Sequence, residues 1–363
     1  MYMPFWSLLL IFVSRNVVLG ASPSPPLFPA MFVFGDSLVD NGNNNYLNSL
    51  AKANYVPYGV DFPSGPTGRF SNGKTLIDVL GELVGLPYLP AFANTLSQGS
   101  NVSAGVNYAS AAAGFLDETG YNLGDRVTIG QQVRNFETTL KQLKNQMVDD
   151  AGLSQHLAKS LVVVHFGSND YINNYLLPEF YGTSLIYNPP DYADLLIGIY
   201  KKLLLDLHSL GLTKFLLGAI GPLGCIPNQL ATGLIPPGQC NSGVNEVVSM
   251  FNDRLKSLVM QLNSDHPGSI FVYGNSYGAF SDIINSPNTY GLSVVDRACC
   301  GVGMNQGQIT CLPLSVPCPN RDQFVFWDAF HPSQAVQQVL AQRAFSGPQS
   351  DCYPVNVQQM AYM

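Results

Sequence analysis

Short apolar runs alternate with longer amphipathic segments along this chain, and that alternation limits the fold more than any other feature of the sequence. The expected strands are apolar and nearly free of charge, at residues 31–35, 161–166, 214–220, 269–273 and 323–327. The expected helices repeat apolar side chains at helical spacing, at residues 75–84, 131–147, 191–210, 242–262 and 333–345. Charge-poor strands separated by helices of this length form a parallel sheet that is covered by helices on both faces.

The composition is that of a compact, loop-rich protein with a large core. Of the 363 residues, 46% are hydrophobic and only 11% are charged, which argues against disorder. The net charge of −7 argues against nucleic-acid binding, and no basic run suggests an anionic membrane surface. Since no repeat and no linker divides the mature chain, we expect a single domain over residues 22–363. The sequence leaves the oligomeric state open.

The first 21 residues have the features of a cleaved secretory signal peptide. An apolar stretch at 7–13 is followed by Leu19-Gly20-Ala21, a small-residue cleavage pattern, although Arg15 interrupts the segment. The alternative is a membrane anchor, but the stretch is shorter than the roughly 20 residues that span a bilayer. We therefore expect residues 1–21 to be removed, no stable membrane insertion, and a secreted, extracellular protein.

The cysteines also indicate an oxidising compartment. All seven lie in the later part of the chain, at Cys225, Cys240, Cys299, Cys300, Cys311, Cys318 and Cys352. Disulfides are the first interpretation for a secreted chain, and metal ligation is the alternative. No Cys-x-x-Cys is present and there are only five His, so we expect no metal. The pairing stays open, and one cysteine is left over. Asn101-Val102-Ser103 is a glycosylation sequon in a polar segment, which makes Asn101 a candidate glycan site.

A candidate nucleophile follows the first expected strand. The run 31–35 stops at Gly35-Asp36-Ser37 and then enters a loop rich in Asn and Gly, which presents Ser37 on a turn. The alternative is that Gly, Asp and Ser are ordinary turn residues there. Under both interpretations we expect Asp36 to be a turn or capping residue.

Polar residues follow two further expected strands. Asp328 and His331 come after the last strand, at a spacing that lets the carboxylate hold one ring N–H and leave the other nitrogen as a base. Asn169 comes after the strand 161–166 and can donate an amide N–H to a developing oxyanion. Each also has a plain structural interpretation, as a surface pair or a helix-capping turn. Because ligands bind beyond the carboxyl ends of parallel strands, we expect these residues and Ser37 to converge. His165 lies inside a strand and is interpreted as a hydrogen-bonded core histidine.

Five motifs in order resemble those of the plant GDSL esterase/lipase family, within the SGNH hydrolases. They are Phe-Gly-Asp-Ser-Leu-Val-Asp-Asn-Gly-Asn-Asn-Asn at 34–45, Gly-Arg-Phe-Ser-Asn-Gly-Lys at 68–74, Asn-Tyr-Ala-Ser-Ala-Ala-Ala-Gly at 107–114, Gly-Ser-Asn-Asp at 167–170, and Asp-Ala-Phe-His-Pro-Ser at 328–333. The resemblance covers about residues 31–355.

The resemblance implies a three-layer α/β/α sandwich with a mostly parallel central sheet. It also implies that Ser37 is the nucleophile, His331 the general base, and Asp328 the partner that orients His331. The oxyanion would be held by the backbone N–H of Ser37, a backbone N–H of the 107–114 block and the side chain of Asn169. Within that block Gly114 is the residue carried over, with Ala111 or Ala112 as alternatives.

The expected function is hydrolysis of carboxylic esters of lipids or other acylated molecules through an acyl-enzyme on Ser37, outside the cell in the apoplast or cell wall. The substrate is therefore a small-molecule or lipid ester, and no metal or organic cofactor is expected. An acyltransferase that uses the same acyl-enzyme is one alternative. A binding protein that has lost turnover on this scaffold is another.

Overall fold

The computed structural model describes residues 25–97 and 99–363, and its centre is a six-stranded sheet. The strand order is β2 (Gly105–Asn107), β1 (Met31–Gly35), β3 (Leu161–His165), β4 (Lys214–Gly218), β5 (Ile270–Gly274) and β8 (Cys352–Tyr353). The first five strands are parallel, and β8 runs antiparallel to β5. The expected mostly parallel sheet is thus confirmed. The predicted signal peptide, residues 1–21, lies outside the described residues.

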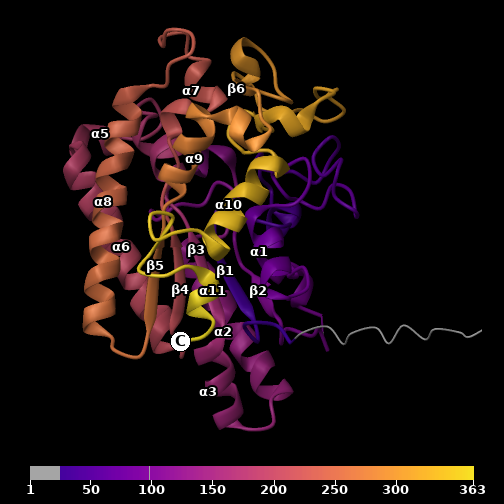
Figure 1. The fold of residues 1–363 in the computed structure, drawn as a ribbon, viewed down its shortest axis with the longest axis vertical. Coiled ribbons are helices and arrows are strands. Elements are labelled where there is room, and N and C mark those ends of the chain that lie inside the picture. The colour runs from indigo at the N-terminus through magenta and orange to yellow at the C-terminus, as the bar shows by residue number, and fades with distance from the viewer. Residues whose placement is uncertain (1–24, 98) are drawn as a thin grey trace, which may run out of the picture.

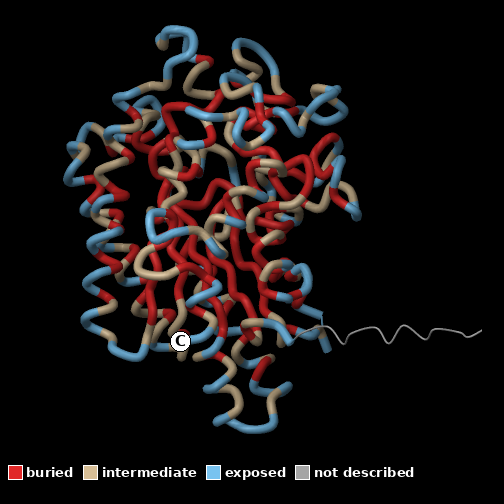
Figure 2. Tube along the Cα trace, viewed as in Figure 1, coloured by how far each residue is buried: buried red, intermediate tan, exposed pale blue. Residues whose placement is uncertain are grey.

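Helices cover both faces of this sheet, as the alternation of short strands and long helices predicts (Figure 1). On one face Phe32 and Phe34 pack in a cluster with α2 (Ile129–Gln146), α6 (Pro189–Ser209) and α8 (Ser242–Asp265). On the other face Met31 and Val33 pack in a cluster with helices α1 (Leu76–Val84), α10 (Gln334–Ser346) and α11 (Val357–Met360). Alternate residues of β1 therefore belong to opposite layers, and the strands form the buried centre of the molecule (Figure 2).

One predicted strand does not belong to the central sheet. The run 323–327 does form β7 (Phe324–Phe326), but β7 pairs with β6 (Val294–Ala298) in a separate two-stranded sheet. The edge of the central sheet beside β5 is taken by β8 instead. An apolar run predicts that a strand is buried, but it does not predict the strand with which it pairs.

For the other expected strands and helices, the predicted ends lie within three residues of the observed ends. Elements that the sequence interpretation missed include β2 and β8, which are too short for a pattern. The helices α3 (Asp150–Lys159) and α9 (Ser276–Asn285) were also missed, and so was the turn of helix α4 (Ser168–Asp170). The further short helices are α5 (Thr183–Ile186) and α7 (Pro227–Leu230).

The cysteines form disulfides, as expected, and the structure supplies the pairing that the sequence left open. The bonds are Cys225–Cys240, Cys299–Cys318 and Cys300–Cys311, and Cys352 is a buried free thiol. Among the described residues no three or more His, Cys, Asp or Glu side chains are grouped as metal ligands would be. No helix in this part of the chain is long and apolar enough to cross a membrane.

Candidate active site

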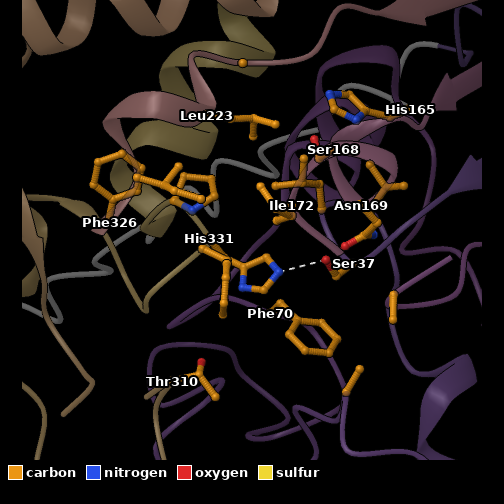
Figure 3. Close-up of a pocket in the computed structure, with 18 of the residues that line it drawn as sticks. Ser37, Phe70, His165, Ser168, Asn169, Ile172, Leu223, Thr310, Phe326 and His331 are labelled. Atoms are coloured by element: carbon orange, nitrogen blue, oxygen red, sulfur yellow. Dashed lines mark hydrogen bonds between the residues drawn. The ribbon is translucent and has the colours of Figure 1, made fainter. Parts of the chain in front are cut away.

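The structure brings together the serine, histidine and aspartate that the sequence placed after different strands. The Oγ of Ser37 lies 2.7 Å from Nε2 of His331 (Figure 3). The Nδ1 of the same ring lies 2.8 and 2.9 Å from the two carboxylate oxygens of Asp328. A carboxylate only accepts hydrogen bonds, so Nδ1 carries the proton and Nε2 accepts from the Ser37 hydroxyl. This is the geometry of an activated nucleophile with an oriented base.

Asp328 is fully buried and hydrogen-bonded on both oxygens. Its Oδ1 accepts the backbone N–H groups of Phe330 and His331 at 2.9 and 2.8 Å. Its Oδ2 accepts the hydroxyl of Tyr58 at 2.5 Å. Burial acts to raise the pKa of Asp328, but the His331 ring and these donors outweigh it and hold the pKa below its usual value. The carboxylate therefore stays ionised beside the imidazole.

Tyr58 is a residue that the sequence interpretation missed. It is buried, it lines the same cavity as Ser37, and it comes from a loop some 270 residues away from Asp328 in the chain. Nothing in the local sequence marks a loop tyrosine as a partner of a distant carboxylate. Only the packing of residues 51–58 against the disulfide-bonded segment and Trp327 brings the two together.

The turn that carries Ser37 depends on a glycine. A Cβ at Gly35 would lie 2.3 Å from Val39 and 2.7 Å from the carbonyl oxygen of His165, so no side chain fits where β1 meets β3. The next residue, Asp36, is a turn residue as expected, since its Oδ1 accepts the backbone N–H of Leu38 at 3.0 Å. Its Oδ2 is buried without a partner among the described residues, and burial raises the pKa of Asp36 to about 7.

Asn169 lies beside Ser37 at the cavity wall (Figure 3). Its side-chain amide donates to the carbonyl of Ala113 at 3.0 Å and accepts from the amide of Asn173 at 2.7 Å. These two bonds fix the orientation of the side chain. The bond to Ala113 uses one of its two N–H groups, which leaves the second for another acceptor.

Within the 107–114 block the structure brings Ala112, and not Gly114, to the cavity wall. Ala112 has a φ of 66°, which is unusual for a residue with a side chain. Gly114 serves a different purpose. A Cβ there would lie 2.5 Å from Oδ1 of Asp170, whose carboxylate accepts the N–H groups of Phe115 and Leu116. Burial raises the pKa of Asp170 to about 6.

The Asn-rich loop after Ser37 holds this block in place. Asn43 donates to the carbonyls of Asn107 and Ala109, at 2.9 and 2.8 Å, and Asn44 donates to the carbonyl of Ala111 at 3.0 Å. The buried carboxylate of Asp40 accepts the N–H of Ala111. On its other side the block bonds to β1, since the N–H groups of Tyr108 and Ser110 donate to the carbonyls of Val33 and Gly35, and the loop satisfies backbone groups that β1 does not reach.

An apolar cavity of about 190 Å³ opens beside the Ser37 and His331 side chains. Its apolar wall includes Phe70, Ile172, Leu223 and Phe326 (Figure 3). Further apolar residues of the wall are Leu76, Ile226, Phe280, Phe330 and Leu340. His165 also lines it, and the expectation of a hydrogen-bonded core histidine was wrong in one respect. Its Nδ1 has no partner in the described part of the chain, and burial lowers the pKa of His165 to about 4, so the ring is neutral. A cavity of this kind fits the apolar part of a substrate.

Comparison with known proteins agrees with the geometry. A family described as GDSL-like Lipase/Acylhydrolase matches residues 31–344. The Arabidopsis thaliana protein named GDSL esterase/lipase At1g71250 is 58% identical over 92% of this chain and 89% of its own length. GDSL esterase/lipase At5g08460 from the same plant is 56% identical over 94% of this chain and 89% of its own length.

Among solved structures, a phospholipase A1 from Streptomyces albidoflavus NA297 aligns with 87% of this chain and 96% of its own. Its TM-score of 0.37 and identity of 11% are too low to support any conclusion. The family match and the plant relatives each span most of the chain, and they are sufficient to assign the family. The chain belongs to the GDSL-like lipase/acylhydrolase family and is an ester-hydrolysing enzyme of the plant GDSL esterase/lipase type.

Proposed function

We propose that this enzyme cleaves carboxylic esters of lipids or other acylated molecules by way of an acyl-enzyme on Ser37. The observation that carries the proposal is the 2.7 Å contact between the Ser37 hydroxyl and Nε2 of His331, in a ring whose other nitrogen is bound to Asp328. His331 takes the hydroxyl proton as the serine oxygen attacks the ester carbonyl. The alcohol then leaves with that proton, and water repeats the cycle on the acyl-enzyme.

The oxyanion of the tetrahedral intermediate needs donors fixed before the reaction. We assign this role to the backbone N–H groups of Ser37 and Ala112 and to the side chain of Asn169. Two facts support Ala112 over Gly114. Ala112 lines the cavity together with Ser37 and Asn169, and its backbone has a left-handed φ, which residues with a side chain rarely adopt. Donors of this kind contribute about 3 kcal/mol each, because they act on charge that develops only in the transition state.

We also infer that the protein functions outside the cell, as one domain after removal of residues 1–21, and that Asn101 carries a glycan. Three disulfides support an oxidising compartment. The exposure of Asn101 in a loop supports the glycan, and its Oδ1 there accepts hydrogen bonds from the N–H and the hydroxyl of Ser103 in the same sequon. Glycosidase treatment of protein secreted from plant cells, followed by mass measurement of the peptide around Asn101, tests whether Asn101 carries a glycan.

Replacement of Ser37 or His331 by Ala is expected to abolish ester hydrolysis. Either change removes a member of one catalytic unit, so the rate on p-nitrophenyl butyrate should fall by about 10³-fold or more in each, with no further loss in the double variant. Ser168→Ala is the matched control, because Ser168 lines the same cavity and its hydroxyl has no hydrogen-bond partner among the described residues. Hydrolysis by Ser37→Ala at the wild-type rate would rule out the proposed nucleophile.

Tyr58→Phe tests whether the hydroxyl bound to Asp328 supports catalysis. The variant keeps the ring in its packing and removes one donor from a buried carboxylate, so kcat/KM should fall by about 5- to 30-fold. Tyr55→Phe is the control, since the Tyr55 hydroxyl donates to the carbonyl of Cys311 and not to Asp328. Equal rates in the two variants would mean that the Tyr58 hydroxyl does not support the Asp328–His331 pair.

Asp36→Asn tests the buried carboxyl beside the nucleophile. The pKa of Asp36 is about 7 in the folded protein and about 4 in an unfolded chain. Between these values the folded protein holds a proton that the unfolded chain has lost, so this stabilisation is complete below about pH 4 and is lost as the pH rises through 7. The Tm of Asp36→Asn, relative to wild type, should therefore rise from pH 4 to pH 8 in calorimetry. A Tm difference that is constant over this range contradicts the buried-proton account.

A further inference from the structure

Two loops beside the cavity are free of charge. Residues 221–241 and 299–318 contain no Asp, Glu, Lys, Arg or His, in a chain with 17 basic and 24 acidic residues. All three disulfides lie within these two loops. The chain therefore fixes two uncharged loops covalently, on the side of the molecule to which the carboxyl ends of the strands point.

The tips of these loops expose large apolar side chains. Leu234 is 85% exposed, Leu314 is 81% exposed and Val316 is 94% exposed, and Met304 and Ile309 are about half exposed. Leu50, which is 80% exposed, lines the cavity that contains Ser37. We call the set Leu50, Leu234, Met304, Ile309, Leu314 and Val316 the apolar rim. Isolated apolar residues on a surface are ordinary, but five of these six lie on the uncharged loops, and a set of this size indicates a contact surface.

Contacts connect the apolar rim to the mouth of the cavity. The N–H of Leu314 donates to the carbonyl of Val56 at 2.9 Å, two residues before the cavity residue Tyr58. Thr310, which also lines the cavity, lies 3.3 Å from the Tyr58 hydroxyl. The loop 221–241 lies against the loop 299–318, since the side chain of Met304 is 3.9 Å from the position that a Cβ would take at Gly233. A molecule bound at the rim therefore lies next to the entrance to Ser37.

The backbone at Leu314 gives an independent indication of function. Its φ of 64° is in the left-handed region, where a leucine is costlier than Gly or Asn. Such strain persists where surrounding structure imposes it, and it is concentrated at functional sites. An exposed leucine gains nothing in the core to offset this cost. Its side chain is thus best explained by a contact that it makes outside the chain.

We propose that the apolar rim docks on a neutral or zwitterionic lipid–water interface and presents an acyl ester from that surface to Ser37. The proposal rests on the ester hydrolysis proposed above. The tips of the two uncharged loops can enter the headgroup region with no charged group of their own to dehydrate. The net charge of −7 argues against attraction to an anionic surface. These loops also supply no charged residue for the complementary charge pairs that steer and orient a protein partner.

Vesicle binding by the Ser37→Ala protein tests the rim without interference from hydrolysis. We expect this protein to co-float with phosphatidylcholine vesicles, and we expect the binding to change little in high salt and not to strengthen with added phosphatidylglycerol. In the same background, Leu314→Asn with Val316→Ser should lower the partition coefficient by roughly tenfold or more. Asn is chosen at 314 because it tolerates a positive φ.

The matched control is Val148→Ser, which removes a fully exposed valine from the connection between α2 and α3, at the opposite end of the molecule (Figure 1). Its vesicle binding should equal that of the Ser37→Ala parent. With Ser37 intact, the rim variants should hydrolyse p-nitrophenyl acetate at the wild-type rate and keep the wild-type Tm, which shows that the fold is unchanged. If the wild type does not hydrolyse p-nitrophenyl acetate, the proposed function is overturned, while the vesicle-binding result still stands.

Three results would overturn the rim proposal. The first is failure of the Ser37→Ala protein to bind phosphatidylcholine vesicles, and the second is equal binding by the rim variant and its parent. The third is a parent that sediments as a dimer and a rim variant that sediments as a monomer, with no difference in vesicle binding. That outcome would assign the rim to contact with a second copy of this chain.

Discussion

The site depends on one constraint, which is that buried backbone polar groups beyond the ends of the strands must find partners without a sheet to supply them. Gln132 meets this need at the end of β1, where its side chain both accepts from the N–H and donates to the carbonyl of Gly35. Asn43 and Asn44 do so for the 107–114 block, and Asp170 for the segment after it. Each of these polar side chains is buried, and Gln132, Asn43 and Asn44 fix backbone that lies next to a proposed catalytic group.

The same constraint explains why so many carboxyl groups lie buried near the nucleophile. Burial raises the pKa of Asp36 to about 7 and of Asp40 and Asp170 to about 6, because their desolvation outweighs the hydrogen bonds that act to lower these pKa values and, for Asp36, the nearby His331 ring. Asp328 is the exception, since the His331 ring lies against both of its oxygens and its pKa stays low. Of these four carboxyl groups, the one that loses its proton at the lowest pH is therefore Asp328, which faces the imidazole, and catalysis by His331 requires an ionised partner there.

The sequence predicts the sheet and the three catalytic candidates because both leave local patterns. Apolar runs mark β1, β3, β4 and β5, and the Asp-x-x-His spacing permits the contact between Asp328 and His331 within a single turn. Other features depend on contacts between distant segments and leave no such pattern. The pairing of β7 with β6, the Tyr58 hydroxyl on Asp328 and the unpartnered Nδ1 of His165 are of this kind. Ala112 is intermediate, since the block was predicted but only the backbone angle and the cavity distinguish it from Gly114.

The most direct measurement of the central claim is covalent trapping of the nucleophile. An alkyl fluorophosphonate reacts with a serine that an adjacent base activates, and peptide mapping by mass spectrometry then identifies the labelled residue. The account predicts one adduct per chain, on Ser37, and its loss in His331→Ala. Ser168 and Ser276 line the same cavity and supply an internal comparison. An adduct on either of them, or labelling that survives Ser37→Ala, would contradict the assignment.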